Sequence, residues 1–169
     1  HLAVASQRIG RGAQSLDDLL VRRGARSRAR RRYLREAWQG CPALRSLGGI
    51  GHRVVHGGDR FIAPVWIDDE VVKAIEALND LAPLHNPACV SGIKAARSAL
   101  GPSVPMVAAF DTSFHSTLPE YASTYAIPYE LTLRHKIRRY GFHGLAHRYA
   151  SLRYAEITEA PIDQINIVT

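Results

Sequence analysis

Short apolar runs of strand length alternate with segments of helical periodicity in this chain, and no other feature constrains its fold as strongly. Residues 50–56 predict a strand that ends at two glycines, and residues 105–110 predict a second strand that leads into an aspartate. Residues 165–168 read as a third, buried strand. Strands of this type alternating with helices indicate an α/β domain.

Three helices are expected between and after these strands. An acidic stretch leads into apolar residues at helical spacing over 71–78, where negative charge favours a helix N-terminus. A second helix is predicted to begin at Asn86 as the N-cap, with Pro87 in the first helical position, and to stop at Gly101. Residues 145–160 predict the third helix, which ends before a proline.

The net charge of +7 comes entirely from the first 48 residues, which hold 11 arginines against 3 acids. Eight of those arginines lie between Arg22 and Arg35. Such a run can bind nucleic acid or an anionic membrane. No interleaved aromatic residues or known module accompany it, so nucleic acid is not expected as a partner, and a solvated arm or a drifted segment fits as well.

Several other classes of protein are not indicated. No stretch approaches the roughly 20 consecutive apolar residues of a membrane span. Residues 1–5 carry no positively charged region ahead of an apolar run, so we expect no signal peptide. Cys41 and Cys89 fit no zinc-binding spacing, as is typical of thiols in a reducing cytoplasm. The chain begins at His1 and stops on an apolar run at Thr169, so we expect a piece of a longer protein.

Polar residues gather where predicted strands end in glycine-rich or polar turns. Three such places are residues 53–58, 111–115 and 138–143, and open α/β sheets bind ligands at the carboxyl ends of their strands. A fourth cluster, residues 84–87, sits at a helix N-terminus, which attracts anions. Arginine, histidine and aspartate around a cleft suit phosphoryl transfer. Spacing alone indicates only an anion-binding α/β domain, since each residue could equally be a salt-bridged, capping or core group.

Five blocks of sequence carry more information than this spacing: GHRVVHGG (51–58), APLHNP (82–87), FDTSFH (110–115), IPY (127–129) and RRYGFHG (138–144). In this order they resemble the acetate kinase family of the acetate and sugar kinase, Hsc70 and actin superfamily. The resemblance implies an α/β fold that is part of an RNase H-like, actin-like ATPase fold with two lobes. It divides the chain into a divergent Arg-rich segment (1–48), part of the N-terminal lobe (49–118) and the start of the C-terminal lobe (119–169).

The implied reaction is phosphoryl transfer from ATP to acetate, giving acetyl phosphate and ADP, and its reverse, with Mg²⁺. The resemblance also implies a cytoplasmic enzyme and is compatible with a homodimer of the full-length parent. The family's phosphate-binding opening turn and most of its ATP- and Mg²⁺-binding segments are absent from this sequence, so we expect little or no kinase activity from the isolated chain. Two alternatives stay open: a propionate kinase, and a non-catalytic remnant whose Arg-rich arm binds nucleic acid or another acidic partner.

The resemblance assigns five residues to the acyl substrate. Arg53 would contact the acyl phosphate, for which a forked guanidinium is better suited than an ammonium group. Val55, Leu84 and Phe142 would line a small apolar pocket for the acetate methyl group, and His85 would lie beside it.

Two further residues, with Arg53, carry the implied chemistry. Asp111 would orient the acceptor or act through the Mg²⁺ shell, and His143 would donate a hydrogen bond to the phosphoryl oxygens. His56 and Arg139 belong to the same blocks, but the resemblance assigns them no role. The family usually shows Thr-Ser after the Gly-Phe-His-Gly turn, and this chain has apolar residues at 145–146 instead.

Overall fold

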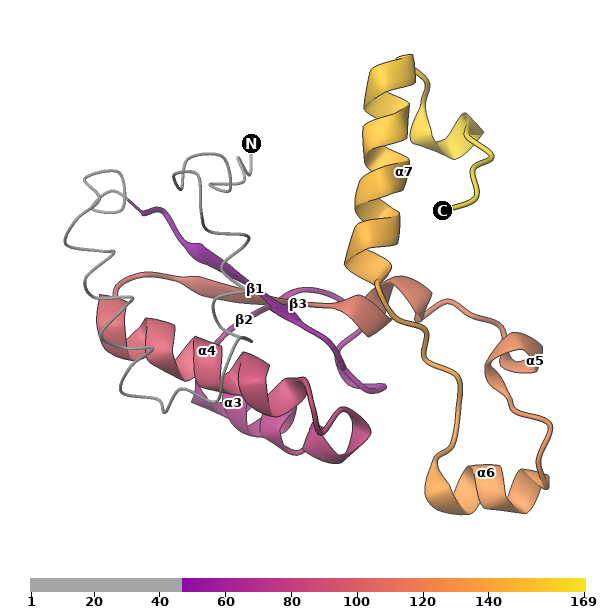
Figure 1. Ribbon diagram of the computed structural model, residues 1–169, viewed down its shortest axis with the longest axis horizontal. Helices are drawn as coiled ribbons and strands as arrows, with labels where there is room; N and C mark the ends of the chain where they lie inside the picture. Colours follow the sequence, from indigo (N-terminus) through magenta and orange to yellow (C-terminus); the bar gives the residue numbers. More distant parts are fainter. Residues whose placement is uncertain (1–46) are drawn as a thin grey trace. The chain divides into compact units, whose positions relative to one another are not determined.

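A computed structural model describes residues 47–169, which fall into two compact units. Residues 49–89 and 105–169 form the larger unit, and the smaller contains residues 90–104 together with residues 47–48. Strands and helices are both present, which confirms the expected α/β class (Figure 1). The elements are β1 (Ile50–Val54), β2 (Val65–Trp66), α3 (Asp69–Glu76), α4 (Asn86–Leu100), β3 (Met106–Phe110), α5 (Glu120–Ser123), α6 (Tyr129–His135) and α7 (Gly144–Thr158), with short 3-10 helices η2 (Asn79–Leu81), η3 (Asp111–His115) and η4 (Ile162–Gln164).

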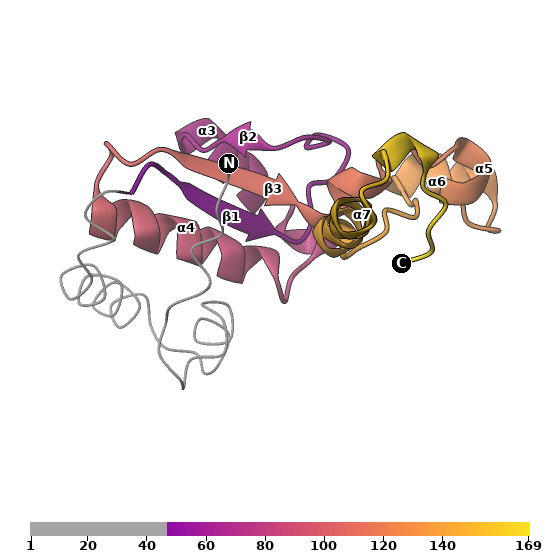
Figure 2. The ribbon, with the colours of Figure 1, turned by 90° about the horizontal axis from the view of Figure 1, so that it is seen from above.

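A three-stranded sheet in the larger unit has the order β1-β3-β2 (Figure 2). β1 runs parallel to β3, with Ile50 opposite Met106 and Val54 opposite Phe110, and β2 runs antiparallel to β3. Both expected strands over 50–56 and 105–110 are confirmed, although the first ends at Val54. Because the two strands run parallel and pair along their full length, the carboxyl ends of β1 and β3 lie side by side.

The core of the larger unit fixes the end of β3. Val54, Ile75 and Phe110 are fully buried, and the rings of Phe61 and Phe110 stack at a centroid distance of 4.5 Å. Each such side chain contributes roughly 1.5–3 kcal/mol through its burial. Asp111 directly follows Phe110, so a fully buried residue of the strand determines where this carboxylate lies.

Local sequence explains how the helices begin and end. The Asp68 carboxylate accepts a hydrogen bond of 2.7 Å from the Val71 N–H, so it caps α3 as its acidic context suggests. Gly101 has φ +82° and donates its N–H to the Arg97 carbonyl oxygen, which ends α4 at the expected place. α7 spans residues 144–158, close to the predicted 145–160.

Two predictions about local structure are wrong. Asn86 is the first residue of α4 rather than its N-cap, because its side-chain amide pairs with the backbone of His56 instead of with the helix. Residues 165–168 form no strand, and Val168 is 97% exposed. A β-strand needs a ladder partner, and residues 47–169 offer none to this segment.

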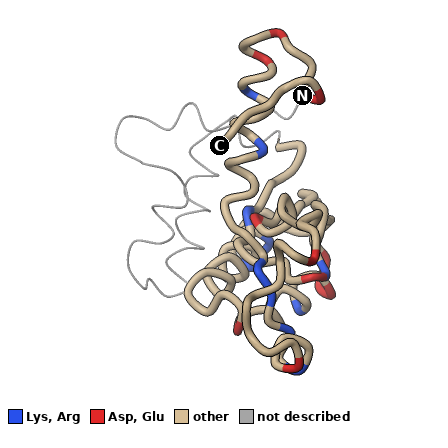
Figure 3. The backbone as a smooth tube through the Cα atoms, turned by 90° about the vertical axis from the view of Figure 1, so that its right-hand side faces the viewer, with Lys and Arg blue, Asp and Glu red and all other residues tan. Residues whose placement is uncertain are grey.

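Charged residues of both signs are interspersed along the described residues, in agreement with the near-neutral composition after residue 48 (Figure 3). The Arg-rich run of residues 22–35 and Cys41 lie outside the described residues. Between residues 47 and 169, no helix is long and apolar enough to cross a membrane. The division into lobes at residues 118 and 119 stays a prediction.

Candidate active site

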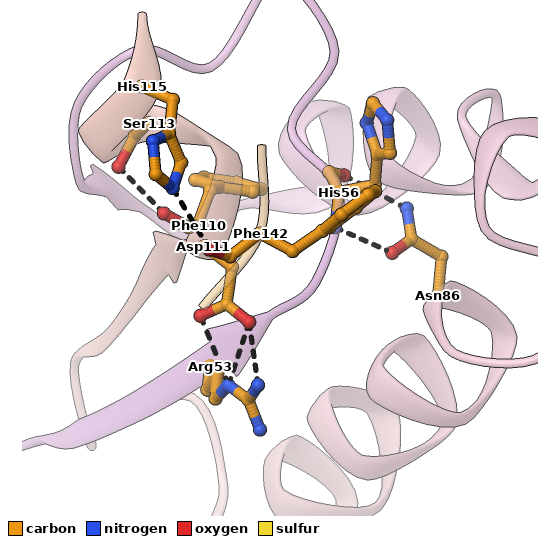
Figure 4. A network of polar contacts seen from close by, with 8 residues as sticks. All are labelled: Arg53, His56, Asn86, Phe110, Asp111, Ser113, His115 and Phe142. Carbon is orange, nitrogen blue, oxygen red and sulfur yellow. Dashed lines mark hydrogen bonds and ion pairs between the residues drawn. The ribbon is translucent and has the colours of Figure 1, made fainter. Parts of the chain in front are cut away.

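An arginine and a buried aspartate meet where β1 and β3 end (Figure 4). Arg53 Nε donates to both carboxylate oxygens of Asp111 at 3.1 Å, and Arg53 Nη2 donates to Oδ2 at 2.6 Å. Asp111 is 1% exposed, whereas the Arg53 side chain is 47% exposed. Charge-assisted pairs of this kind are strong and directional. The guanidinium is therefore oriented by a buried carboxylate while it still reaches solvent.

The loop that follows β1 is tied to the start of η3. The buried Gly57 N–H donates to Thr112 Oγ1 at 2.9 Å, and Ser113 Oγ donates to the Phe110 carbonyl oxygen at 2.7 Å. Val55 is half-buried and directly follows the last residue of β1. The blocks 51–58 and 110–115 are thus joined by a hydrogen bond between a backbone N–H and a hydroxyl group.

His56 is a buried histidine whose backbone and ring are both held in place. Its N–H donates to Asn86 Oδ1 at 3.1 Å, and Asn86 Nδ2 donates back to the His56 carbonyl oxygen at 3.0 Å. The Gly58 N–H donates to His56 Nδ1 at 3.0 Å, so Nδ1 is an acceptor and the neutral ring carries its proton on Nε2. Burial lowers the pKa of His56, opposed by the nearby Asp59, which agrees with a neutral ring.

The turn of residues 138–144 packs against this histidine. The rings of Tyr140 and Phe142 lie edge-on to the His56 ring, with centroid distances of 4.5 and 5.7 Å. Asp59 accepts hydrogen bonds from Arg138 Nη1 at 2.9 Å and from the Tyr140 hydroxyl at 3.3 Å. Burial and then the Asp59 carboxylate raise the pKa of Tyr140, so its hydroxyl stays protonated as a donor.

The opposite side of the same turn contacts His115. His115 Nε2 lies 2.9 Å from the Phe142 carbonyl oxygen, so Nε2 carries the proton of this hydrogen bond. Gly141 has φ +73°, and a Cβ at this position would lie 2.5 Å from His115 Cγ. Only glycine combines this backbone conformation with such a close approach.

His143 stands where the turn passes into α7. Its backbone is left-handed, with φ 58°, and its carbonyl oxygen accepts the N–H groups of Ala146 and His147. The next residue, Gly144, is buried so tightly that a Cβ would collide with the Asp111 carbonyl oxygen and Phe114. His143 is therefore placed beside the end of β3, with its side chain exposed.

The structure brings together some of the seven residues singled out in the sequence. Arg53 and Asp111 are in contact, and the Phe142 ring contacts His56, the residue after Val55. Gly144, the residue after His143, lies against the Asp111 backbone.

Leu84 and His85 are not enclosed with the others. Both lie before α4, Leu84 is 85% exposed, and His85 is exposed as well.

The sequence reasoning missed the residues that hold these groups in place. They are His56, Asp59, Asn86, Thr112 and His115. All but Asp59 belong to the five sequence blocks, and this membership could have marked them as candidate site residues. Block membership does not show which residues form hydrogen bonds with one another.

A hollow of about 190 Å³ lies beside this network. It is lined by Gly58, Asp59, Ile62, Thr112, His115, Ser116, Arg138 and Tyr140. None of the seven residues singled out in the sequence lines it.

The described residues contain no cluster of metal-ligating side chains. Nowhere in residues 47–169 do three or more His, Cys, Asp or Glu side chains gather as they would around a metal ion. The buried carboxylate nearest the strand ends, Asp111, is engaged by Arg53. Mg²⁺ usually takes one or two carboxylates together with waters and substrate phosphates. No chemical step is therefore assigned to a metal on this part of the chain.

Solved structures of two kinases resemble this fold. The acetate kinase of Porphyromonas gingivalis aligns with a TM-score of 0.73 and 38% identity, covering 83% of this chain and 36% of that one. The propionate kinase of Francisella tularensis aligns with a TM-score of 0.70 and 45% identity, covering 76% and 33%. Both have the actin-like ATPase fold, so the chain is part of an α/β kinase fold of that class, as expected.

Sequence comparison narrows this class to one family. The acetokinase family matches residues 20–169, and the chain belongs to that family. The acetate kinase of Thermoanaerobacter pseudethanolicus is 57% identical over 126 residues, and that of Thermotoga maritima is 56% identical over 126 residues. Each alignment covers 75% of this chain and 31% of the relative, so the chain spans about a third of the length of these curated proteins.

Proposed function

We propose that this chain supplies the acyl-substrate side of an acetate kinase, which transfers a phosphoryl group from ATP to acetate and catalyses the reverse reaction. An acetate oxygen forms a bond to the γ-phosphorus, and the bond between that phosphorus and the oxygen bridging to ADP breaks. The observation that carries the proposal is the Arg53–Asp111 pair at the ends of β1 and β3, with the turn of Phe142 and His143 packed beside it.

Arg53 is proposed to bind the acetate carboxylate or the acyl phosphate. Asp111 engages the Nε edge of its guanidinium, which fixes the direction in which the group meets an anion. Preorganised donors of this kind stabilise charge in a transition state without reorganising. Asp111 would orient the acceptor through this contact, or act through the Mg²⁺ shell once the remaining ligands are supplied. His143, exposed at the start of α7, would donate to the phosphoryl oxygens.

Val55, Leu84 and Phe142 are proposed to enclose the acetate methyl group, with His85 beside them. Leu84 is 85% exposed, so the pocket closes only when further protein covers it. A small apolar pocket of this kind discriminates by about 1–3 kcal/mol for each added methylene group.

Cofactors and partners follow from the same proposal. ATP or ADP and Mg²⁺ would bind mostly through the part of the parent that this chain, at 31% of the relatives' length, does not contain. Mg²⁺ would neutralise phosphoryl charge there. A cytoplasmic location and a homodimer of the full-length parent complete the proposal.

A segment exchange tests this function. Residues 49–169 of this chain replace the matching segment of the Thermotoga maritima acetate kinase, and acetyl phosphate formation is followed by trapping with hydroxylamine. We expect the hybrid to turn over, and alanine at Arg53, Asp111 or His143 to lower kcat/KM by about 100-fold or more. Lys73→Ala on the surface of α3 is the control and should change nothing. A folded hybrid without turnover refutes the proposal.

The isolated chain is expected to show little or no turnover in the same assay. Turnover at even a hundredth of the hybrid's rate would contradict the view that the nucleotide side must come from elsewhere.

Propionate is a second candidate substrate, favoured by the 45% identity to the Francisella tularensis propionate kinase. The ratio of kcat/KM for acetate to that for propionate decides between the two acids in the same hybrid.

A further inference from the structure

Three of the five sequence blocks meet at His56 (Figure 4). His56 itself belongs to the block 51–58. Its N–H and carbonyl oxygen are both held by the Asn86 side chain, from the block 82–87. Its ring lies edge-on to Tyr140 and Phe142, from the block 138–144. The family resemblance assigned this residue no role.

The position of the His56 ring is fixed from several directions. The residue is 2% exposed, and the Gly58 N–H donates to Nδ1, which sets both the side-chain rotamer and the tautomer. Asn86 is also fully buried. Buried polar groups held by several hydrogen bonds have little freedom to move. A side chain that meets His56 therefore takes its own position from it.

Two residues of the proposed acyl pocket depend on His56 in this way. Val55 precedes it in the chain, and Phe142 reaches its ring at a centroid distance of 5.7 Å. Leu84 lies two residues before Asn86, the residue that is bonded to the His56 backbone. Arg53 and Asp111, in contrast, are oriented by each other at the ends of β1 and β3.

We propose that His56 is a positioning residue for the acyl-binding pocket, holding Phe142 and the segment that carries Leu84 in fixed relation to Val55. This inference rests on the proposed function. His56 acts through its neighbours and touches no reacting atom. Its loss should therefore raise the KM for the carboxylic acid and reduce the discrimination between acetate and propionate, while kcat changes little.

Two substitutions in the hybrid enzyme separate the ring from its hydrogen bond. His56→Asn keeps an acceptor near the position of Nδ1 for the Gly58 N–H but removes the ring that supports Phe142. We expect about a tenfold or larger rise in the KM for acetate, a kcat within about threefold, and a narrower acetate-to-propionate ratio. His56→Phe keeps a ring against Phe142 and loses the acceptor, so it should lower the Tm but keep the preference for one acid.

A control and a third variant complete the test. His52→Asn changes a histidine of β1, four residues before His56, that makes none of these contacts with the turn, and it should leave KM and the acid preference unchanged. Asn86→Asp removes the donor to the His56 carbonyl oxygen without altering the imidazole, so it should raise the KM in the same direction. This variant gives a result even if His56→Asn does not fold.

The outcomes are distinct. A folded His56→Asn or Asn86→Asp enzyme with unchanged KM and unchanged acid preference overturns the inference and leaves the residue a purely structural one. Equal loss of kcat and kcat/KM overturns it too, since that pattern belongs to a group acting in the transition state. A failure of the proposed function shows earlier and differently, as absent turnover in the unsubstituted hybrid.

Discussion

The Arg53–Asp111 pair predicts an asymmetry between two conservative substitutions. Arg53→Gln removes the cation from a carboxylate that is 1% exposed. Breaking a fully buried pair from one side costs about 3–5 kcal/mol, and partial solvation through the half-exposed arginine lowers this to about 2–3 kcal/mol. Asp111→Asn leaves a guanidinium that is 47% exposed and can be hydrated, so it should cost only about 1 kcal/mol.

Urea unfolding of the chain, followed by circular dichroism at 222 nm, measures this difference. The free energy of unfolding should fall by about 1–2 kcal/mol more for Arg53→Gln than for Asp111→Asn, with little change in the slope against urea. The exposed pair of Lys73 and Glu70 is the matched control, because its side chains are 70% and 77% exposed at an N–O distance of 2.9 Å. Lys73→Gln should stay within about 0.5 kcal/mol of the parent.

A double variant measures the interaction between Arg53 and Asp111 directly. Two neutral amides can still share a hydrogen bond, so Arg53→Gln combined with Asp111→Asn should recover about 1–2 kcal/mol relative to the sum of the single changes. Equal costs for the two single variants, or a larger cost for Asp111→Asn, would show that burial of the carboxylate does not control the energy of the pair.

Three further predictions concern single positions. Gly141→Ala should destabilise the fold by about 1–3 kcal/mol, because this residue has a φ of +73° and lies against His115. Gly92→Ala, in a helix with open space around it, should stabilise the fold by up to about 1 kcal/mol. Thermal melts of the two variants measure the difference. Asp68→Ala should cost α3 about 1 kcal/mol while Asp68→Asn costs little, which urea midpoints would show. Burial lowers the pKa of both His52 and His56, so the unfolded chain binds more protons below about pH 6.5. Stability should therefore be fully present above that pH and decline as the pH falls through it, and a flat urea midpoint between pH 7.5 and 5.5 would contradict this.

Local patterns predicted the elements that carry the site. The apolar run 105–110 gave a strand ending at Asp111, and the block 138–144 gave a turn before α7. Parallel pairing of two neighbouring strands, which is typical of an α/β pattern, brings together the strand ends that carry Arg53 and Asp111. These features depend on residues close in the chain or on one simple pairing rule. The expected strand at 165–168 failed because a strand also needs a partner.

Long-range polar pairing was beyond the sequence. Asp59 reaches Arg138 across 79 residues, and Arg53 reaches Asp111 across 58. Nothing in the spacing of charged residues distinguishes these partners from the other acids and bases along the chain. The partners are fixed by packing of the elements that carry them, which local propensity does not describe.

Asn86 shows how a sound local prediction can fail because the same side chain is bound elsewhere in the fold. An asparagine before a proline is a good helix N-cap by its sequence context. A buried backbone N–H and carbonyl oxygen on one residue also need partners, and among uncharged side chains a primary amide offers a donor and an acceptor side by side. At His56 both groups are buried, so the amide of Asn86 lowers the free energy more there than at a helix end, where solvent can satisfy the N–H groups. The same asparagine then links the start of α4 to the loop after β1, which is the connection on which the proposed acyl pocket depends.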